Sequence, residues 1–123
     1  MTTEDYPELS MMNRTDIIAA SIRLRAARKF AGIGQEALGD AIGRSVSNIS
    51  NMERARSFPA LEAIMYLWNN HRVDANFIVA GHYAQLPADV LPDLMRSLAD
   101  EISKTDLLSG SEKPQLSAET QST

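Results

Sequence analysis

The chain has 123 residues, of which 44% are hydrophobic, and a formal net charge of -4. This length supports one compact domain with a modest core. No apolar run reaches the roughly 18 residues of a membrane span, and the acidic N-terminus is unlike a secretory signal. The absence of cysteine excludes a disulfide framework and a thiolate metal site. Together these features predict a cytoplasmic protein.

The charge is unevenly distributed along the chain. Residues 13–72 carry nine basic and five acidic residues, a balance of +4, whereas residues 1–12 carry -3 and residues 73–123 carry -5. A basic segment within an acidic chain is typical of a surface that binds phosphate. Because a surplus of this size also arises by chance, it is only a minor indication by itself.

The first part of the chain reads as an arm followed by a helix. Residues 1–12 lack periodicity and contain Pro7, so we predict a flexible acidic arm. A helical pattern then begins at Thr15 or Asp16, either of which can cap it, and runs to about Ala31. Its apolar stripe is Ile17, Ala20, Leu24, Ala27 and Ala31. The cations predicted to lie on its other faces are Arg23, Arg25 and Lys29.

Residues 35–53 contain two short amphipathic patterns on either side of a glycine. Leu38 and Ile42 are four residues apart and share one helix face, and Ile49 and Met52 share another at a spacing of three. Gly43 lies between the two pairs, where a C-terminal cap in the left-handed conformation belongs.

A second glycine and a serine complete this motif. Ser45 or Ser47 can cap the second helix. Gly39 lies inside the first helix at a cost of about 1 kcal/mol relative to alanine, so a packing reason is expected. Two helices that cross steeply over a short turn supply it, because a side chain at position 39 would collide with the second helix. Residues 35–53 therefore predict a helix-turn-helix.

Two further helices are expected after the motif. Pro59 marks a loop boundary, and a helix at about residues 60–70 is predicted to bury Leu61, Ile64, Leu67 and Trp68. Asp74 can cap a short helix at residues 75–80, which Gly81 ends.

The next stretch predicts a C-terminal helix and a tail. The pattern places a helix from Pro92 to about Ser103 within residues 87–108, which we interpret as an oligomerisation segment. The predicted dimerisation residues are Val90, Leu91, Leu94, Met95, Leu98 and Ile102. The alternative is that this helix folds back on its own domain. Residues 109–123 are polar and are predicted to form a disordered tail.

At this point the chain resembles a known family over about residues 17–81. It is similar to the helix-turn-helix superfamily of Cro and the phage repressors. The matching residues are Leu24, Arg25, Arg28, Gly32, Ile33, Gln35, Glu36, Leu38, Gly43, Ser45, Ile49, Ser50, Glu53, Arg54, Pro59, Leu61, Val73 and Phe77 to Gly81. Three positions depart from the family pattern. Gly34 replaces a capping serine, Arg44 replaces an apolar residue, and Ala55 replaces a loop glycine. The resemblance implies an all-α, five-helix lambda-repressor-like domain at residues 13–86, here followed by a C-terminal helix.

The outward face of the second motif helix is the predicted DNA-reading surface. Such a helix enters the major groove, where short polar side chains can bond base edges. The predicted base-reading residues are Ser45, Val46, Ser47, Asn48 and Asn51. The predicted phosphate contacts are Gln35, Arg44, Ser50, Arg54 and Arg56, with Gln35 assigned by the resemblance. The alternative is that these short polar residues only make the helix surface soluble, but this face lacks the Glu and Lys usual for that purpose.

The resemblance also implies a structural ion pair between Arg28 and Glu53. No constellation for catalysis, metal or cofactor binding is recognised. His71 and His82 are not at metal-ligand spacing, and the adjacent carboxylates of Asp100 and Glu101 point to different helix faces. We therefore predict a protein that is not an enzyme and binds no cofactor.

The sequence thus predicts a transcriptional regulator that binds double-stranded DNA, a dimeric repressor of phage or bacterial type. Only about 40 residues follow Gly81, too few for a small-molecule effector domain. The alternative is an antitoxin of the same superfamily, which neutralises a protein partner through its C-terminal segment and autoregulates its operon.

Overall fold

The computed structural model describes residues 1–105, and this part of the chain is entirely helical apart from its connections. The prediction of an all-α fold is therefore confirmed. The helices are η1 (Thr3–Asp5), α1 (Tyr6–Leu9), α2 (Ile17–Phe30), α3 (Gln35–Ile42), α4 (Val46–Glu53), α5 (Leu61–His71), α6 (Ala75–Ala80) and α7 (Leu91–Lys104). The predicted tail at residues 109–123, and residues 106–108 of the segment before it, lie outside the described residues.

Local capping sets most of the helix boundaries. The carboxylate of Asp16 accepts the backbone N–H of Ala19 at 3.2 Å and begins α2. The carboxylate of Asp74 accepts the N–H of Asn76 at 2.7 Å and begins α6. Gly81 then adopts the left-handed conformation that ends α6. These caps are the ones that the sequence predicts, because each depends on residues within one helical turn.

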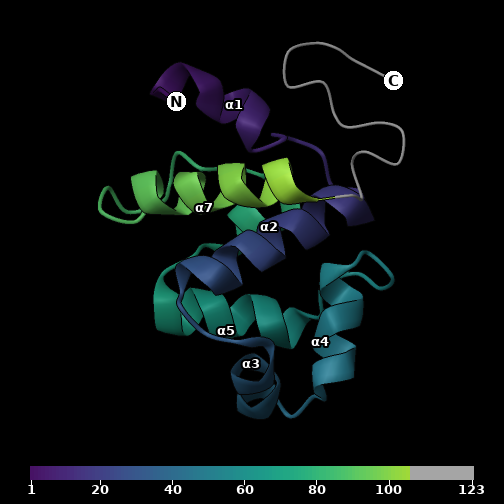
Figure 1. Cartoon of the computed structure of the whole chain (residues 1–123). Coiled ribbons are helices and arrows are strands. Elements are labelled where there is room, and N and C mark those ends of the chain that lie inside the picture. The colour runs from purple at the N-terminus through teal and green to yellow at the C-terminus, as the bar shows by residue number, and fades with distance from the viewer. Residues whose placement is uncertain (106–123) are drawn as a thin grey trace.

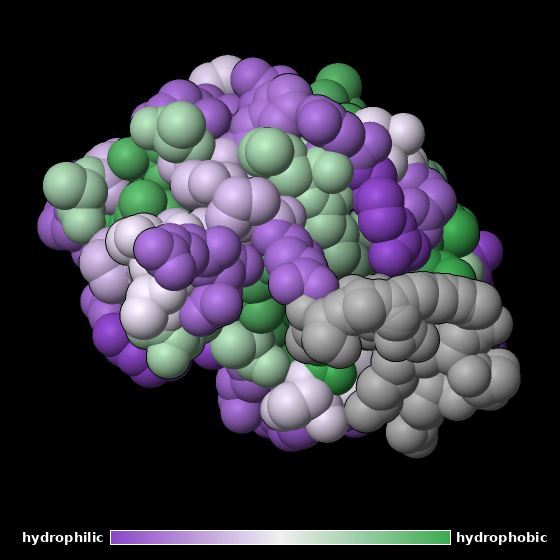
Figure 2. All heavy atoms as spheres, turned by 90° about the horizontal axis from the view of Figure 1, so that it is seen from above, coloured by the Kyte–Doolittle hydropathy of each residue, from purple (hydrophilic) through white to green (hydrophobic). Residues whose placement is uncertain are grey.

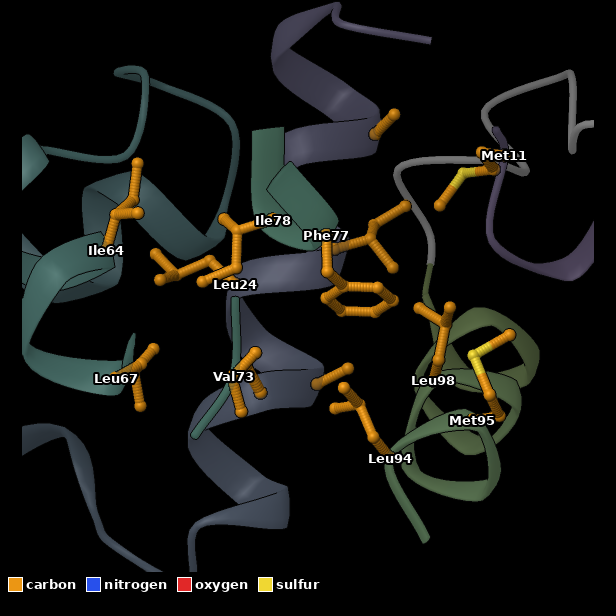
Figure 3. Close-up of a cluster of buried hydrophobic side chains, with 14 of the residues drawn as sticks. Met11, Leu24, Ile64, Leu67, Val73, Phe77, Ile78, Leu94, Met95 and Leu98 are labelled. Carbon is orange, nitrogen blue, oxygen red and sulfur yellow. The ribbon is translucent and has the colours of Figure 1, made fainter. Parts of the chain in front are cut away.

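The helices form layers around α2 (Figure 1). α1 and α7 lie on one side of α2, whereas α5, α3 and α4 lie on the other. The buried side chains of α5, α6 and α7 meet between these layers, with Phe77 and Ile78 at the centre (Figure 3). α3 and the start of α4 therefore lie on the side of the molecule away from α1 and α7 (Figure 1).

Residues 1–12 form an ordered part of the fold and not a flexible arm. They contain η1 and α1, and Tyr6, Leu9 and Met11 are all buried. The Tyr6 ring packs edge-on against Tyr83, with ring centroids 5.6 Å apart. Because three apolar side chains enter the core, burial orders a segment that has no helical periodicity of its own.

The apolar stripe of α7 packs inside the chain and is not available as the predicted dimer surface. Val90, Leu94, Met95, Leu98 and Ile102 are each at most 3% exposed, and Leu91 is partly buried. α7 lies along α2, and its Ser97 hydroxyl donates to the Ala26 carbonyl at 2.8 Å. Seen from above, the outer face shows hydrophilic residues between small apolar groups (Figure 2). The fold-back alternative is correct, since the stripe completes the core of its own domain.

The predicted inward face of α5 is only partly right. Ile64 and Leu67 are buried, but Leu61 is 69% exposed and Trp68 is 42% exposed. Leu61 and Trp68 are seven residues apart, so they share the face of α5 that points away from the core. The indole of Trp68 thus remains in contact with solvent.

Arg23 is the second correction to the predicted helix faces, because its side chain is fully buried. Its guanidinium donates to five backbone carbonyls, those of Ser10, Met11, Arg14, Ile78 and Val79, at 2.5 to 3.2 Å. These bonds match the five N–H donors of a guanidinium. Burial lowers the pKa of Arg23 to about 10, so the group stays charged at neutral pH. Arg23 therefore fastens the N-terminal segment to the end of α6.

Candidate nucleic-acid interface

A tight turn joins α3 to α4. Gly43 ends α3 with φ +74°, and the N–H of Arg44 donates to the carbonyl of Gly39 at 2.8 Å. A Cβ at position 39 would collide with the backbone carbonyl of Arg44 and touch Ile49 of α4 at 3.5 Å. Glycine is therefore needed at 39, as predicted, although the closest obstacle is the turn itself and not the second helix.

α4 begins with a serine cap and presents small side chains outward. The Ser45 hydroxyl accepts the N–H of Asn48 at 3.0 Å, which selects Ser45 over Ser47 as the cap. Ser45, Val46 and Ser47 are exposed, and Val46 is 45% exposed. The predicted base-reading residues at the start of α4 thus share an open surface, whereas Ile49 and Met52 are buried beneath it.

The two asparagines of α4 are half-buried at the edge of this surface. The Asn48 side-chain oxygen accepts a bond from the Arg44 guanidinium at 2.8 Å. That guanidinium also reaches the Glu62 carboxylate at 3.3 Å. Arg44, where the family usually has an apolar residue, therefore ties the turn to both α4 and α5. The Asn51 side chain makes no hydrogen bond within residues 1–105.

A buried ion pair fixes the orientation of α4. The Glu53 carboxylate accepts two bonds from the Arg28 guanidinium, at 2.5 and 2.9 Å, and both side chains are less than 10% exposed. Arg28 also donates to the Ile33 carbonyl at 2.8 Å. The pair implied by the resemblance is therefore present in the structure. Since desolvation offsets the Coulomb attraction of a buried pair, its clearest contribution is to the geometry of the site.

The predicted phosphate contacts differ in their exposure and in the bonds that they already make within the chain. Arg54 and Arg56 follow α4, are exposed, and form no ion pair within the described part of the chain. Ser50 is half-buried. The Gln35 amide donates to the Glu53 carboxylate at 3.0 Å and so joins the buried pair. For Gln35, the structure shows a role in holding α3 against α4.

Sequence reasoning missed two polar residues, Arg25 and Glu101, that hold the end of α4 against α2 and α7. Arg25 donates to the backbone carbonyl of Glu53 at 3.1 Å and to the carboxylate of Glu101 at 2.8 Å. Glu101, on α7, is only 2% exposed. The sequence offered no signal for this contact, because the two partners are 76 residues apart.

The comparison with protein families agrees with this geometry. A family model described as a helix-turn-helix domain matches residues 19–75, which include α3, the turn and α4. The chain therefore carries a helix-turn-helix domain, as the resemblance to the Cro and phage-repressor superfamily predicts. No curated protein and no solved structure matches the chain. None of the helices in residues 1–105 has the length and apolar character needed to cross a membrane.

Proposed function

We propose that this chain is a transcriptional regulator that binds double-stranded DNA in a sequence-specific manner, with α4 in the major groove. One observation carries the proposal: a serine-capped helix with small outward side chains is anchored from behind by the buried pair of Arg28 and Glu53. A helix of this kind reads base edges with its N-terminal part. The helix-turn-helix match over residues 19–75 supports the same assignment.

The roles within the site follow from exposure and chemistry. Asn51 and Asn48 offer a donor and an acceptor to adenine, and Val46 offers a methyl contact to thymine. Ser45 and Ser47 complete the base-reading face. We propose as phosphate contacts Arg44, Ser50, Arg54 and Arg56, together with Gln35 at the start of α3. We propose repression by occlusion in the cytoplasm, without a cofactor.

Selection of binding sites from random duplex DNA, followed by variants, tests the proposal. Asn51→Ala should lose about 1–3 kcal/mol of discrimination between the selected site and a mismatched site. Arg54→Ala should weaken binding to all sequences alike and reduce the salt dependence by about one counterion. If the wild-type chain selects no sequence, or if Asn51→Ala keeps the full preference, the assignment of α4 is wrong.

An antitoxin is the less favoured alternative. That function needs a C-terminal surface to bind a partner, but the apolar face of α7 is buried within the chain. Purification from the native host distinguishes the two, because a small basic partner in equal amount would favour the antitoxin.

We further propose that the chain binds DNA as a two-fold dimer through the exposed face of α5. One reading helix contacts only a few base pairs, so regulators of this kind present two. Leu61 and Trp68 on this face, with Phe58 in the preceding loop at 44% exposure, are large apolar groups open to solvent. α5 also contacts the turn before α4 through Glu62 and Arg44, so pairing there would fix the two reading helices relative to each other.

A further inference from the structure

A cleft of about 590 Å³ lies where the end of α7 and the loop after α4 meet over α2. Five cations line it: Arg25, Lys29, Arg54, Arg56 and Lys104. Glu101 is the one carboxylate among the lining residues. The loop and the end of α7 lie toward the same end of α2 (Figure 1). The cleft thus collects positive charge from three elements that are distant in sequence.

Glu101 organises one wall of the cleft. Its carboxylate lies 2.8 Å from the Arg25 Nε, 3.1 Å from the Lys29 Nζ and 3.6 Å from the Lys104 Nζ. Lys104 also pairs with Asp100 at 3.0 Å. One buried carboxylate therefore holds three cations close together, and the wall remains positive even when Asp100 is included.

The opposite wall carries two cations, Arg54 and Arg56, whose charge no ion pair offsets within residues 1–105. Both side chains are exposed on the loop after α4. The two walls are joined by Arg25, which donates to the carbonyl of Glu53, the last residue of α4. The cleft therefore starts where the reading helix ends.

Clustered cations of this kind repel one another and are stabilised by an anion. DNA carries its phosphates at a regular spacing along the groove edge, and each phosphate bound releases condensed counterions. Phosphate contacts also fix the register of a protein on the duplex without reading bases.

We propose that this cleft binds backbone phosphates of the DNA beyond the bases read by α4, with Lys29 of α2 and Lys104 of α7 as its outer contacts. The proposal rests on the proposed function, since it assumes that α4 lies in the major groove. It gives α7 a second role: besides closing the core, its C-terminal end extends the DNA-binding surface.

Charge-removing variants test this in the full-length chain. Lys29→Gln and Lys104→Gln remove exposed side chains, at 42% and 54% exposure, so the fold should be retained. Arg96→Gln is the matched control, because Arg96 lies on α7 like Lys104, is 68% exposed and does not line the cleft. We expect each cleft variant to reduce the slope of log K against log salt by about one, equally on selected and random DNA, with no such change for Arg96→Gln.

Ethylation of DNA phosphates locates the contact. With the wild-type chain, ethylation of a phosphate outside the selected bases should block binding, and Lys104→Gln should be insensitive to that phosphate. Wild-type slopes for both cleft variants, alongside a loss of discrimination by Asn51→Ala, would overturn the cleft and leave the proposed function standing. A wild-type chain that binds no DNA would overturn both. Binding of pyrophosphate at the cleft without any change in the DNA slope would assign the cleft to small phosphorylated ligands and also reject the proposal.

Discussion

At the scale of single residues, Ala55 shows the cost of departing from the family pattern. Ala55 has φ +60°, the left-handed region that favours glycine, in the loop after α4. A non-glycine residue there costs about 1–2 kcal/mol, partly offset by the greater flexibility of glycine in the unfolded chain. We expect Ala55→Gly to raise the free energy of unfolding by about 0.5–1 kcal/mol, measured by urea denaturation. Gly43→Ala, which introduces the same strain at φ +74°, should lower it; equal stability of both variants would contradict this account.

Replacement of the buried Arg23 should be strongly destabilising. Its five donors satisfy five buried or half-buried carbonyls, and lysine has only three donors on a single atom. We expect Arg23→Lys to lower the free energy of unfolding by about 3 kcal/mol, since it leaves buried acceptors without a partner. Arg96→Lys, on an exposed side chain, should change it by less than about 0.5 kcal/mol. Similar values for the two variants in thermal unfolding would show that the carbonyls find other donors.

Glu101 predicts a specific pH dependence of stability. Burial acts to raise the pKa of its carboxyl group, but the hydrogen bond and charge of Lys29, with Arg25 and Lys104, outweigh this and lower the pKa below the usual 4.5. A carboxyl group with a lowered folded-state pKa stabilises the fold above pH 4.5, and this stability is lost as the pH falls through the folded-state value. The wild-type chain should therefore exceed Glu101→Gln in stability at pH 7, and the difference should shrink below pH 4.5. A difference independent of pH would mean that the carboxylate charge is not what Glu101 contributes.

At the scale of helices, the apolar stripe of α7 could either pack in the core of its own chain or form an interface between chains. The sequence pattern does not distinguish these two roles. Leu98 is fully buried within the chain, and it lies beside Met95 in the cluster of core side chains in Figure 3. We expect Leu98→Ala to lower the free energy of unfolding by about 2–5 kcal/mol, because it leaves a cavity in the core. The molecular mass in solution should not change. A variant of unchanged stability but reduced mass would restore α7 as an interface between chains.

The sequence predicts the helices whose boundaries are local and misses what depends on distant partners. The caps at Asp16, Ser45 and Asp74 are readable because donor and acceptor lie within one turn. The ordering of residues 1–12 is not, since α1 has only four residues and its order comes from burial against the rest of the fold. For α7, the sequence predicts which face is apolar, but it does not predict which part of the structure covers that face.

The same division holds in the candidate interface. Which side of α4 faces outward follows from the buried spacing of Ile49 and Met52. The contact of Arg25 with Glu101 joins residues 76 positions apart, and periodicity carries no information on such pairs. Trp68 was misplaced because apolar residues lie on both sides of α5, and the pattern alone does not say which side the core covers.

At the scale of the whole molecule, the exposed face of α5 is our candidate for self-association among residues 1–105. Because the apolar side chains of α7 are buried in the core of their own chain, a dimer needs another apolar surface. The face of α5 that carries Leu61 offers one, since Leu61 is 69% exposed. Leu61, Met65 and Trp68 recur at steps of four and three, so they form one stripe along the helix. A two-fold axis at this stripe would place Leu61 and Trp68 of one chain against the same residues of the other.

We therefore predict that the wild-type chain has twice its 13.5 kDa mass in solution and that the double variant Leu61→Glu, Trp68→Gln is a folded monomer. The fold should survive because Leu61 and Trp68 are 69% and 42% exposed and lie outside the buried core, whereas like charges facing across the axis would oppose pairing. Affinity for an operator with two half-sites about 34 Å apart should fall steeply, while binding to a single half-site should stay the same. Met12→Glu, at a 41% exposed apolar residue outside this stripe, is the control and should remain dimeric. A wild-type monomer, or a double variant that still dimerises, would exclude α5 as the interface; analytical ultracentrifugation with and without operator DNA decides between these outcomes.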